Sequence, residues 1–509
     1  MADESEHHEH HPLQAFEADV AGDASGARGT IDIAVAEADS GKDGLERTMG
    51  PVNLTAIGVA AVVGAGIFVV TGHAAAVDAG PAVIVSFVIA GVVATLAAVC
   101  YSELASMIPL SGSTYSYAYS AMGTFVAWVI GWDLLVEYLF GAANVANGWS
   151  GYFTNLLAEV GVEVPNALRY APVSDGGAPT GIMNLPAMCL VAFVTFILYM
   201  GSKESARATT LFVGVKLVTL AVFVGFGVFS LTWGNYTPFI PPPSGGHFGW
   251  GGIFVAAGTV FYSYISFDAV CTAAQEAKNP RRTVPIGVMG SLGIATVLYV
   301  IVGFVLVGLV SYTALNVSDP LSSALEAAGL GWVGTIVDIG AVIGLAASVT
   351  ALLFSQTRIL MRMSEDGMLP KRFSVVSKTR KVPEFTILLC GLACIVMTGL
   401  LPLAILTELI SIGTLLAFMI VAAAVIVLRK TRPDLKRPFK VPGGPTIPII
   451  SILASLVIML SLPWETWLRL FIWLAIGLVI YFLYSKSRAD AVIVEREKRQ
   501  REARSPEAS

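Results

Sequence analysis

Charged residues are scarce in this chain, and their scarcity excludes a soluble globular fold. Asp, Glu, Lys and Arg make up 13% of the 509 residues, whereas 55% of the residues are hydrophobic. The mean hydropathy is +0.74. This composition is typical of a protein that crosses a membrane several times.

Cysteine and histidine are also few. The five cysteines all fall within apolar runs (Cys100, Cys189, Cys271, Cys390 and Cys394), which argues against an exported disulfide framework. Beyond the first 11 residues the only histidines are His73 and His247, so the sequence lacks the buried axial ligands that a membrane haem protein needs. It has no phosphate-binding loop of the Walker type and no metal-ligand cluster, which argues against an ATP-driven pump. We expect no cofactor and no metal site.

Long apolar runs are abundant. Runs of about 20 residues, enough to cross ~30 Å of hydrocarbon, begin near Pro51, Pro81, Met122, Met183, Arg207, Trp250, Pro285, Thr335, Pro383, Leu403, Thr446 and Thr466. We therefore predict an all-α polytopic membrane protein with about twelve spans.

Basic residues predict the orientation of these spans. Alternate loops and the two ends of the chain contain 28 of the 31 Lys and Arg residues, and such an excess marks the cytoplasmic side. Both termini are therefore expected in the cytoplasm, with the spans in the cell (inner) membrane. Residues 1–48 carry twelve acids and three bases and are predicted to form a disordered, acidic, His-rich tail. Residues 487–509 form a second cytoplasmic tail.

Two glycines interrupt the first apolar run, in the stretch "VVGAGIFVVTG". If the helix breaks near Gly64, the N–H groups of Ala65, Gly66 and Ile67 face the protein interior, where they and the half-helix dipole suit a carboxylate. The first half then ends in free carbonyls such as that of Val62, which suit an ammonium group. Small residues are also common where membrane helices merely pack closely, so a packing surface is the alternative interpretation.

A second interruption, "AGTVFYSYISFDAV", occurs about five spans later, at residues 257–270. Its carbonyls near Tyr262, Ser263 and Ile265 offer further acceptors for an ammonium group. Because five is an odd number of crossings, spans one to five (residues 49–231) and six to ten (residues 250–428) would form an inverted repeat. Residues 429–486 would add a basic loop and two more spans. Paired interruptions of this kind indicate a transporter whose substrate lies near the midplane.

Several stretches resemble a known family: "GAGIFVVTGHAA", "YSELASMIPLSGSTYSYAY", "GWDLLVEYLFGAANVANGWSGY", "FYSYISFDAVCTAAQEAKNPRRTVPIGV" and "LLFSQTRILMRMSEDGMLP". They are similar to amino acid permeases of the amino acid, polyamine and organocation superfamily, in its cationic amino acid transporter branch. The resemblance implies a leucine-transporter-like fold with two inverted halves of five spans plus two additional helices. It places the substrate carboxylate on the amides of Ala65 and Gly66, and the ammonium group on the carbonyls of Val62, Tyr262, Ser263 and Ile265. The sequence departs from the family pattern at Tyr262, where a Phe is usual, and at Ser266, where a Gly is usual.

Ionisable residues within spans are functional candidates, because they are costly in lipid. The resemblance implies that the Lys216 ammonium stands where sodium-coupled relatives hold a cation, bridging the bend of the first span to the eighth span. A permanent structural ion pair is the alternative. Asp268 would cap the second half-helix or act in gating, and Glu137 would line the third span and exchange protons or pair with a cationic substrate. Three further acids near span ends are expected to be interfacial: Glu103, Asp338 and Glu408.

The expected function is secondary active transport of free L-amino acids by alternating access, with the proton as coupling ion. An amino acid exchanger is the first alternative, and a channel or a transporter-like receptor is less favoured. The substrate can be cationic or small and neutral on this reasoning. The expected partners are the amino acid and membrane lipid, and the basic loop "RKTRPDLKRPFKVPGG" is interpreted as a lipid-surface signal rather than a nucleic-acid patch.

Overall fold

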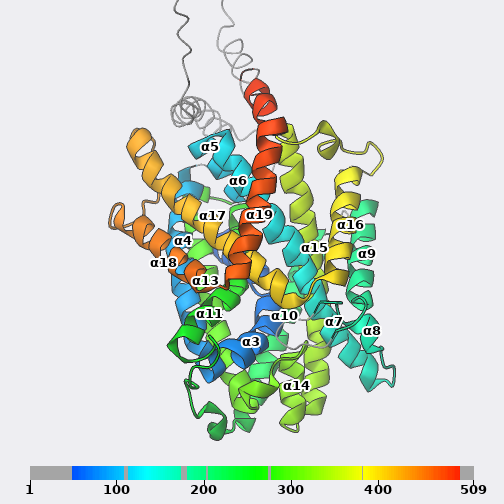
Figure 1. The fold of residues 1–509 in the computed structure, drawn as a ribbon. Helices are drawn as coiled ribbons and strands as arrows, with labels where there is room; N and C mark the ends of the chain where they lie inside the picture. The colour runs from blue at the N-terminus through cyan, green and yellow to red at the C-terminus, as the bar shows by residue number, and fades with distance from the viewer. Residues whose placement is uncertain are drawn as a thin grey trace, which may run out of the picture.

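The computed structural model describes residues 49–107, 113–173, 180–201, 205–272, 277–380, 382–492 and 494. The predicted tail at residues 1–48 and most of the one at residues 487–509 lie outside this part of the chain. Within the described residues the regular secondary structure is helical, apart from two isolated bridges. Figure 1 shows the helices gathered into one bundle.

Six helical segments are long and apolar enough to cross a membrane: Gly66–Met107, Thr124–Glu159, Arg281–Leu309, Gly331–Glu365, Leu403–Thr431 and Trp464–Val492. Their helices are α4 (Val83–Met107), α6 (Thr124–Leu135), α7 (Gly141–Glu159), α13 (Pro280–Leu309), α15 (Gly331–Glu365), α17 (Leu403–Thr431) and α19 (Trp464–Ile480). A π-helical turn, η4 (Val136–Phe140), joins α6 to α7. The shorter apolar helices are α9 (Leu185–Met200), α10 (Ser205–Gly227), α16 (Glu384–Leu400) and α18 (Thr446–Ser461). By length and composition, these helices indicate a helical, multi-pass membrane protein.

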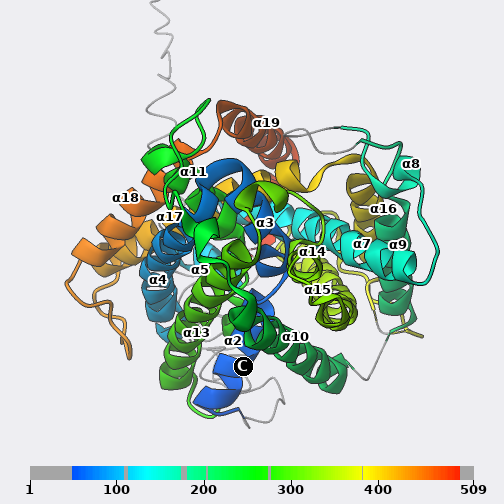
Figure 2. The same ribbon diagram turned by 90° about the horizontal axis from the view of Figure 1, so that it is seen from below.

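Two apolar stretches are interrupted, and the first of them runs into the long segment Gly66–Met107. The first contains α2 (Pro51–Val62), η1 (Gly66–Val70), α3 (Thr71–His73) and η2 (Ala74–Ala79). The second contains α11 (Gly249–Phe261), η7 (Tyr262–Tyr264) and α12 (Ala269–Thr272). The helices outside these segments include α5 (Ser113–Met122), α8 (Asn166–Arg169) and α14 (Pro320–Ala327). Figure 2 shows α3 and α14 near the middle of the bundle, with α13, α10, α15 and α9 around them.

Small residues bring neighbouring helices together inside the bundle. A side-chain carbon added at Gly340 of α15 would lie 2.9 Å from Cβ of Thr219 on α10, and one at Gly391 of α16 would lie 2.9 Å from Cβ of Thr195 on α9. Both separations are too short for a real side chain, so these pairs rely on glycine. Close packing at small residues is the usual basis of helix association in lipid.

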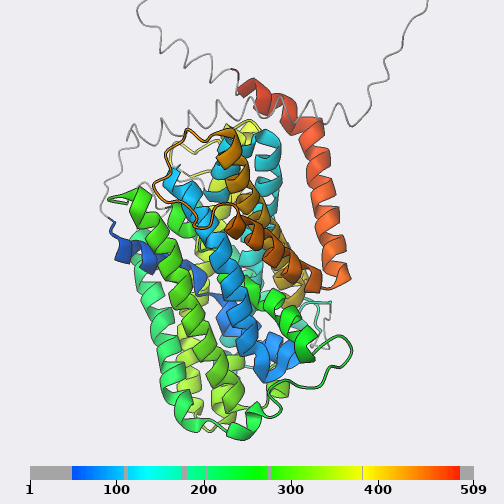
Figure 3. The ribbon, with the colours of Figure 1, turned by 90° about the vertical axis from the view of Figure 1, so that its left-hand side faces the viewer.

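The outside of the bundle is apolar, as a lipid-facing surface requires. Large hydrophobic side chains are exposed on several helices, for example Phe193 on α9, Val218 on α10 and Leu460 on α18. Figure 3 shows α19 standing at the edge of the bundle. The interrupted helices lie inside this outer layer, since Ala65, Ile67 and Phe261 are fully or almost fully buried.

Candidate functional site

The first interruption lies where the sequence predicts it. Helix α2 ends at Val62, and Val63 is extended, with φ −74° and ψ 98°. Helical structure resumes at Gly66 and continues to Ala79. The N–H of Ile67 donates to the Gly64 carbonyl at 3.3 Å, so this predicted carboxylate donor already has a partner. Ala65 and Gly66 stand at the start of the resumed helix, where N–H groups have no acceptor one turn earlier.

The second interruption has a sharper bend. After η7 the chain is extended at Ile265, with φ −69° and ψ 159°, and Ser266 then adopts a φ of 69°. This left-handed conformation is unfavourable for a residue with a side chain and favours glycine. The N–H of Ile265 donates to the Tyr262 carbonyl at 3.2 Å, so one of the predicted ammonium acceptors is partly occupied.

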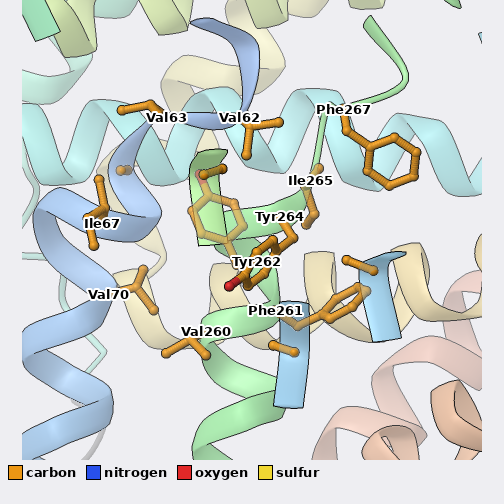
Figure 4. Close-up of a cluster of buried hydrophobic side chains, with 14 of the residues drawn as sticks. Val62, Val63, Ile67, Val70, Val260, Phe261, Tyr262, Tyr264, Ile265 and Phe267 are labelled. Carbon is orange, nitrogen blue, oxygen red and sulfur yellow. The ribbon is translucent and has the colours of Figure 1, made fainter. Parts of the chain in front are cut away.

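The two interruptions meet at Gly66 and Ser263. A side-chain carbon added at Gly66 would lie 2.5 Å from Cα and 2.6 Å from Cβ of Ser263. Figure 4 shows Ile67 and Val70 of the first segment and Val260, Tyr262 and Ile265 of the second around this junction. The sequence predicts that these segments come together, and the close approach explains why position 66 requires glycine.

A buried hydroxyl at this junction lacks a partner. Ser263 is 2% exposed, and its Oγ has no hydrogen-bond partner among the described residues. Leaving a buried polar group unsatisfied costs about 1–3 kcal/mol. A polar ligand bound between the two interruptions would remove this cost.

Tyr299 of α13 joins the same two interruptions, and sequence reasoning did not identify it. Its hydroxyl lies 2.8 Å from the Val62 carbonyl oxygen and 2.8 Å from the Ser263 carbonyl oxygen. A phenol has one proton to donate, so it satisfies one of these carbonyls at a time. Two of the predicted ammonium acceptors therefore converge on one point and share one donor. A tyrosine within the apolar run "TVLYVIVGF" was the available signal.

Lys216 of α10 reaches the first interruption. Its Nζ donates to the Val63 carbonyl at 3.2 Å and to Ser348 Oγ of α15 at 2.5 Å. Lys216 is 4% exposed. The placement therefore links the bend of the first segment to α15. None of the described acids forms an ion pair with Lys216, so the alternative of a permanent salt bridge has no partner in this part of the chain.

Three further acids are buried in the bundle: Asp133, Glu137 and Asp268. Thr114 Oγ1 lies 3.3 Å from Asp268 Oδ2, and Thr414 Oγ1 lies 3.4 Å from Glu137 Oε2. Glu137 lies on η4 and is 5% exposed. Asp133, one turn earlier, is 1% exposed, and neither of its carboxylate oxygens has a hydrogen-bond partner among the described residues. Asp133 and Glu137 are four residues apart, so they lie on roughly the same face of the segment Thr124–Glu159.

Glu103 and Asp338, expected to be interfacial, are buried in the protein and bonded to other side chains. Glu103 is 1% exposed and binds the Arg429 guanidinium through both carboxylate oxygens, at 3.0 and 2.5 Å. Asp338 is fully buried and accepts a hydrogen bond of 2.8 Å from Asn155. Glu408 is partly exposed and pairs with Arg469 at 3.1 Å. Each acid has a protein partner that a single sequence cannot reveal, because the partners come from distant segments.

A contact between His247 and Asp78 ties the C-terminal part of the first interrupted segment to the start of the second. His247 Nδ1 lies 3.0 Å from Asp78 Oδ1, and Thr259 Oγ1 donates to Asp78 Oδ2 at 3.2 Å. The N–H of Phe248 also donates to the Asp78 carbonyl at 2.7 Å. The hydrogen bond to Asp78 raises the pKa of His247 above its ordinary value.

Comparison with known proteins gives consistent matches. The amino acid permease family matches residues 49–484. A methylthioribose transporter of Bacillus subtilis (strain 168) is 43% identical over 452 residues, which are 89% of this chain and 96% of that protein. The branched-chain amino acid permease BcaP of the same organism is 42% identical over 453 residues, with the same coverage of 89% and 96%. A vacuolar cationic amino acid transporter 4 of Arabidopsis thaliana is 36% identical over 78% of this chain and 65% of that protein.

Proposed function

The chain belongs to the amino acid permease family, and from that premise we propose that it takes up free L-amino acids by proton-coupled, secondary active transport. The substrate lies between the two interruptions, with its carboxylate on the N–H groups of Ala65 and Gly66. Its ammonium group lies on the carbonyls of Val62 and Ser263. The chain is a transporter and not an enzyme.

One observation carries this proposal: the unpartnered Ser263 hydroxyl at the junction with Gly66. The Tyr299 hydroxyl, shared by two carbonyls beside it, supports the same assignment. The Ser263 hydroxyl therefore lacks a partner among the described residues, and so does whichever of the Val62 and Ser263 carbonyls Tyr299 does not bond. A zwitterionic amino acid supplies both kinds of partner, an anionic acceptor and a cationic donor.

The fold supports alternating access around this point. We propose a leucine-transporter-like arrangement of two inverted halves of five spans, followed by α18 and α19 as the two additional spans. In this arrangement the protein lies in the cell membrane, with its basic loops and both termini on the cytoplasmic side. The coupling proton binds the Lys216 amine, which bonds both the first interruption and α15.

A neutral, apolar side chain fits the walls of the junction best. Ile67, Val70 and Val260 are buried there with the ring of Tyr262. The match to a branched-chain amino acid permease over 96% of its length favours the same class. The match to a methylthioribose transporter adds a second candidate, which lacks both zwitterion charges.

Purified protein reconstituted in sodium-free liposomes tests the transport proposal. Labelled leucine, alanine, arginine and methylthioribose are offered with and without an inside-alkaline pH gradient. We expect leucine to accumulate only with the gradient. A requirement for sodium, or for amino acid inside the liposomes, would contradict proton symport, and the latter result would identify an exchanger. Flux without acceleration by substrate on the opposite side would identify a channel.

Two variants test the site and the coupling separately. Ser263→Ala removes the unpartnered hydroxyl, so we expect an unchanged or higher melting temperature and weaker leucine binding. Lys216→Met should keep leucine counterflow and lose accumulation driven by the pH gradient, whereas Lys278→Met, at an exposed position, should behave as wild type. If leucine accumulation in Lys216→Met still depended on the pH gradient, Lys216 would have a structural role only.

A further inference from the structure

A hollow lies beside the first interrupted segment. Two of the elements that line or flank it, α3 and α14, lie at the end of the bundle opposite the C-terminal ends of α17 and α19 (Figure 1). Its volume is about 250 Å³. Drug-sized ligands occupy pockets of about 300–1,000 Å³, so this hollow suits a ligand as small as one amino acid. Its walls come from six separate stretches of the chain, including η1, α3, α7, α8 and the turn before α14.

Opposite charges line this hollow without pairing. Arg169 of α8 has a buried Nε with no hydrogen-bond partner among the described residues, and its recorded contact is with the ring of the adjacent Tyr170, at 5.5 Å. Asp319, at the start of α14, is 6% exposed and accepts hydrogen bonds from Ser318 and Ser323 at 3.2 and 3.1 Å. Arg169 and Asp319 interact electrostatically, but they form no ion pair in the described part of the chain. A guanidinium and a carboxylate that line one hollow are complementary to the two ends of a zwitterion.

We infer that this hollow is an outer binding site for a free amino acid with an apolar side chain. The carboxylate of the ligand binds the Arg169 guanidinium, its ammonium group binds the Asp319 carboxylate, and its side chain packs on Val69, Leu401 and Leu403, which line the same hollow. This inference rests on the proposed function, because it assigns a second position to the same substrate.

The hollow is linked to the central junction through one continuous helix. Val69 lies on η1, which begins at Gly66, and His73 follows on α3. Helix α14 packs directly on this segment, since a side-chain carbon added at Gly72 would lie 2.5 Å from Cβ of Pro320. Asp319 immediately precedes that proline. An amino acid in the hollow therefore contacts both α14 and the half-helix whose start forms the central carboxylate site.

Binding stoichiometry of labelled leucine on the purified full-length protein tests this inference. We expect two classes of site in the wild type and only the weaker class in Gly66→Leu, whose side chain forces the two interrupted segments apart at the central site. In that background Arg169→Gln should weaken leucine binding at least tenfold. The matched control is Arg488→Gln. Arg488 also stacks on a tyrosine ring, at 4.3 Å, but it is not among the residues that line the hollow.

Ligand analogues separate the two charges. In the Gly66→Leu background, Arg169→Gln should leave binding of leucinamide, which lacks the carboxylate, unchanged. Asp319→Asn should weaken leucine and leave N-acetyl-leucine, which lacks the ammonium group, unchanged. Size-exclusion profiles and melting temperatures establish that each variant is folded.

The outcomes distinguish this inference from the proposed function. One equivalent of leucine on the wild type and none on Gly66→Leu would overturn the outer site and leave the central site intact. No leucine binding to the wild type would overturn the proposed function as well. If Gly66→Leu and the double variant Gly66→Leu/Arg169→Gln bound leucine with equal affinity, Arg169 would not bind the carboxylate.

Discussion

Replacing Gly66 by alanine is the sharpest test of the junction, because one methyl group acts at the point where the interruptions touch. The added carbon would lie 2.5 Å from Ser263 Cα, whereas carbon atoms pack at about 3.5 Å or more. The shortfall is therefore about 1 Å. Since Ser263 Cα belongs to the backbone, no side-chain rotation relieves it, and the two half-helices have to separate by about that distance.

This separation fixes the expected magnitude. Charge-assisted hydrogen bonds to a carboxylate are about 2.7–2.9 Å long, and an added 1 Å breaks any bond that spans the two halves. Losing one such bond costs about 1.5–3 kcal/mol. Because 1.4 kcal/mol corresponds to a factor of ten, we expect leucine to bind Gly66→Ala about tenfold to a hundredfold more weakly.

Gly64 supplies the matched control. A carbon added at Gly64 meets Ser348 Oγ only at 3.9 Å, so Gly64→Ala fits without displacement. Both purified variants are compared by equilibrium binding of labelled leucine, with melting temperature and elution profile to establish folding. Wild-type affinity in Gly66→Ala, or an equal loss in Gly64→Ala, would refute the reasoning.

Three further changes test neighbouring features. Ser266→Gly relieves the left-handed φ of 69° and should stabilise the protein by about 1 kcal/mol; an unchanged or lower melting temperature would show that Ser266 makes a compensating contact. Tyr299→Phe leaves the Val62 and Ser263 carbonyls without their shared donor, so the ligand-free melting temperature should fall and the increase on adding leucine should become larger; a smaller increase would argue against an ammonium group at these carbonyls. The raised pKa of His247 means that its protonated form stabilises the fold fully below pH ~6.5 and loses this effect as the pH rises through the raised value. The melting temperature of His247→Gln should therefore lie further below wild type at pH 5.5 than at pH 9, and a constant difference would count against the ion pair with Asp78.

The interruption of the first segment could be predicted from sequence because its cause is local. Gly64 and Gly66 weaken the helix where they stand, and the structure breaks between Val62 and Gly66. The same holds for the second interruption, where small and polar residues lie within an apolar run. Its sharpest feature, the positive φ of Ser266, could not be predicted, since serine itself disfavours that conformation.

Partners from distant segments could not be predicted. Tyr299 bonds to carbonyls 237 and 36 residues away, and neither separation leaves a periodic signal in the chain. Arg429 lies 326 residues from Glu103, so no sign in the sequence indicates that Glu103 is buried against a guanidinium. Sequence patterns report which faces are apolar, whereas the pairing of polar groups depends on how the helices pack.

The packing around Lys216 shows how a proton could act on the junction. Gly344 of α15 leaves room for the lysine stem, since a side-chain carbon there would lie 2.5 Å from Lys216 Cγ. The lysine tip then donates to Val63 on one side and to Ser348 on the other. A neutral amine can still donate both bonds, so losing the proton need not change the geometry. It does weaken the bonds, because charge-assisted hydrogen bonds are about twice as strong as neutral ones. Under the proposed proton coupling, protonation of Lys216 would strengthen the connection between the first interruption and α15, and loss of the proton would weaken it.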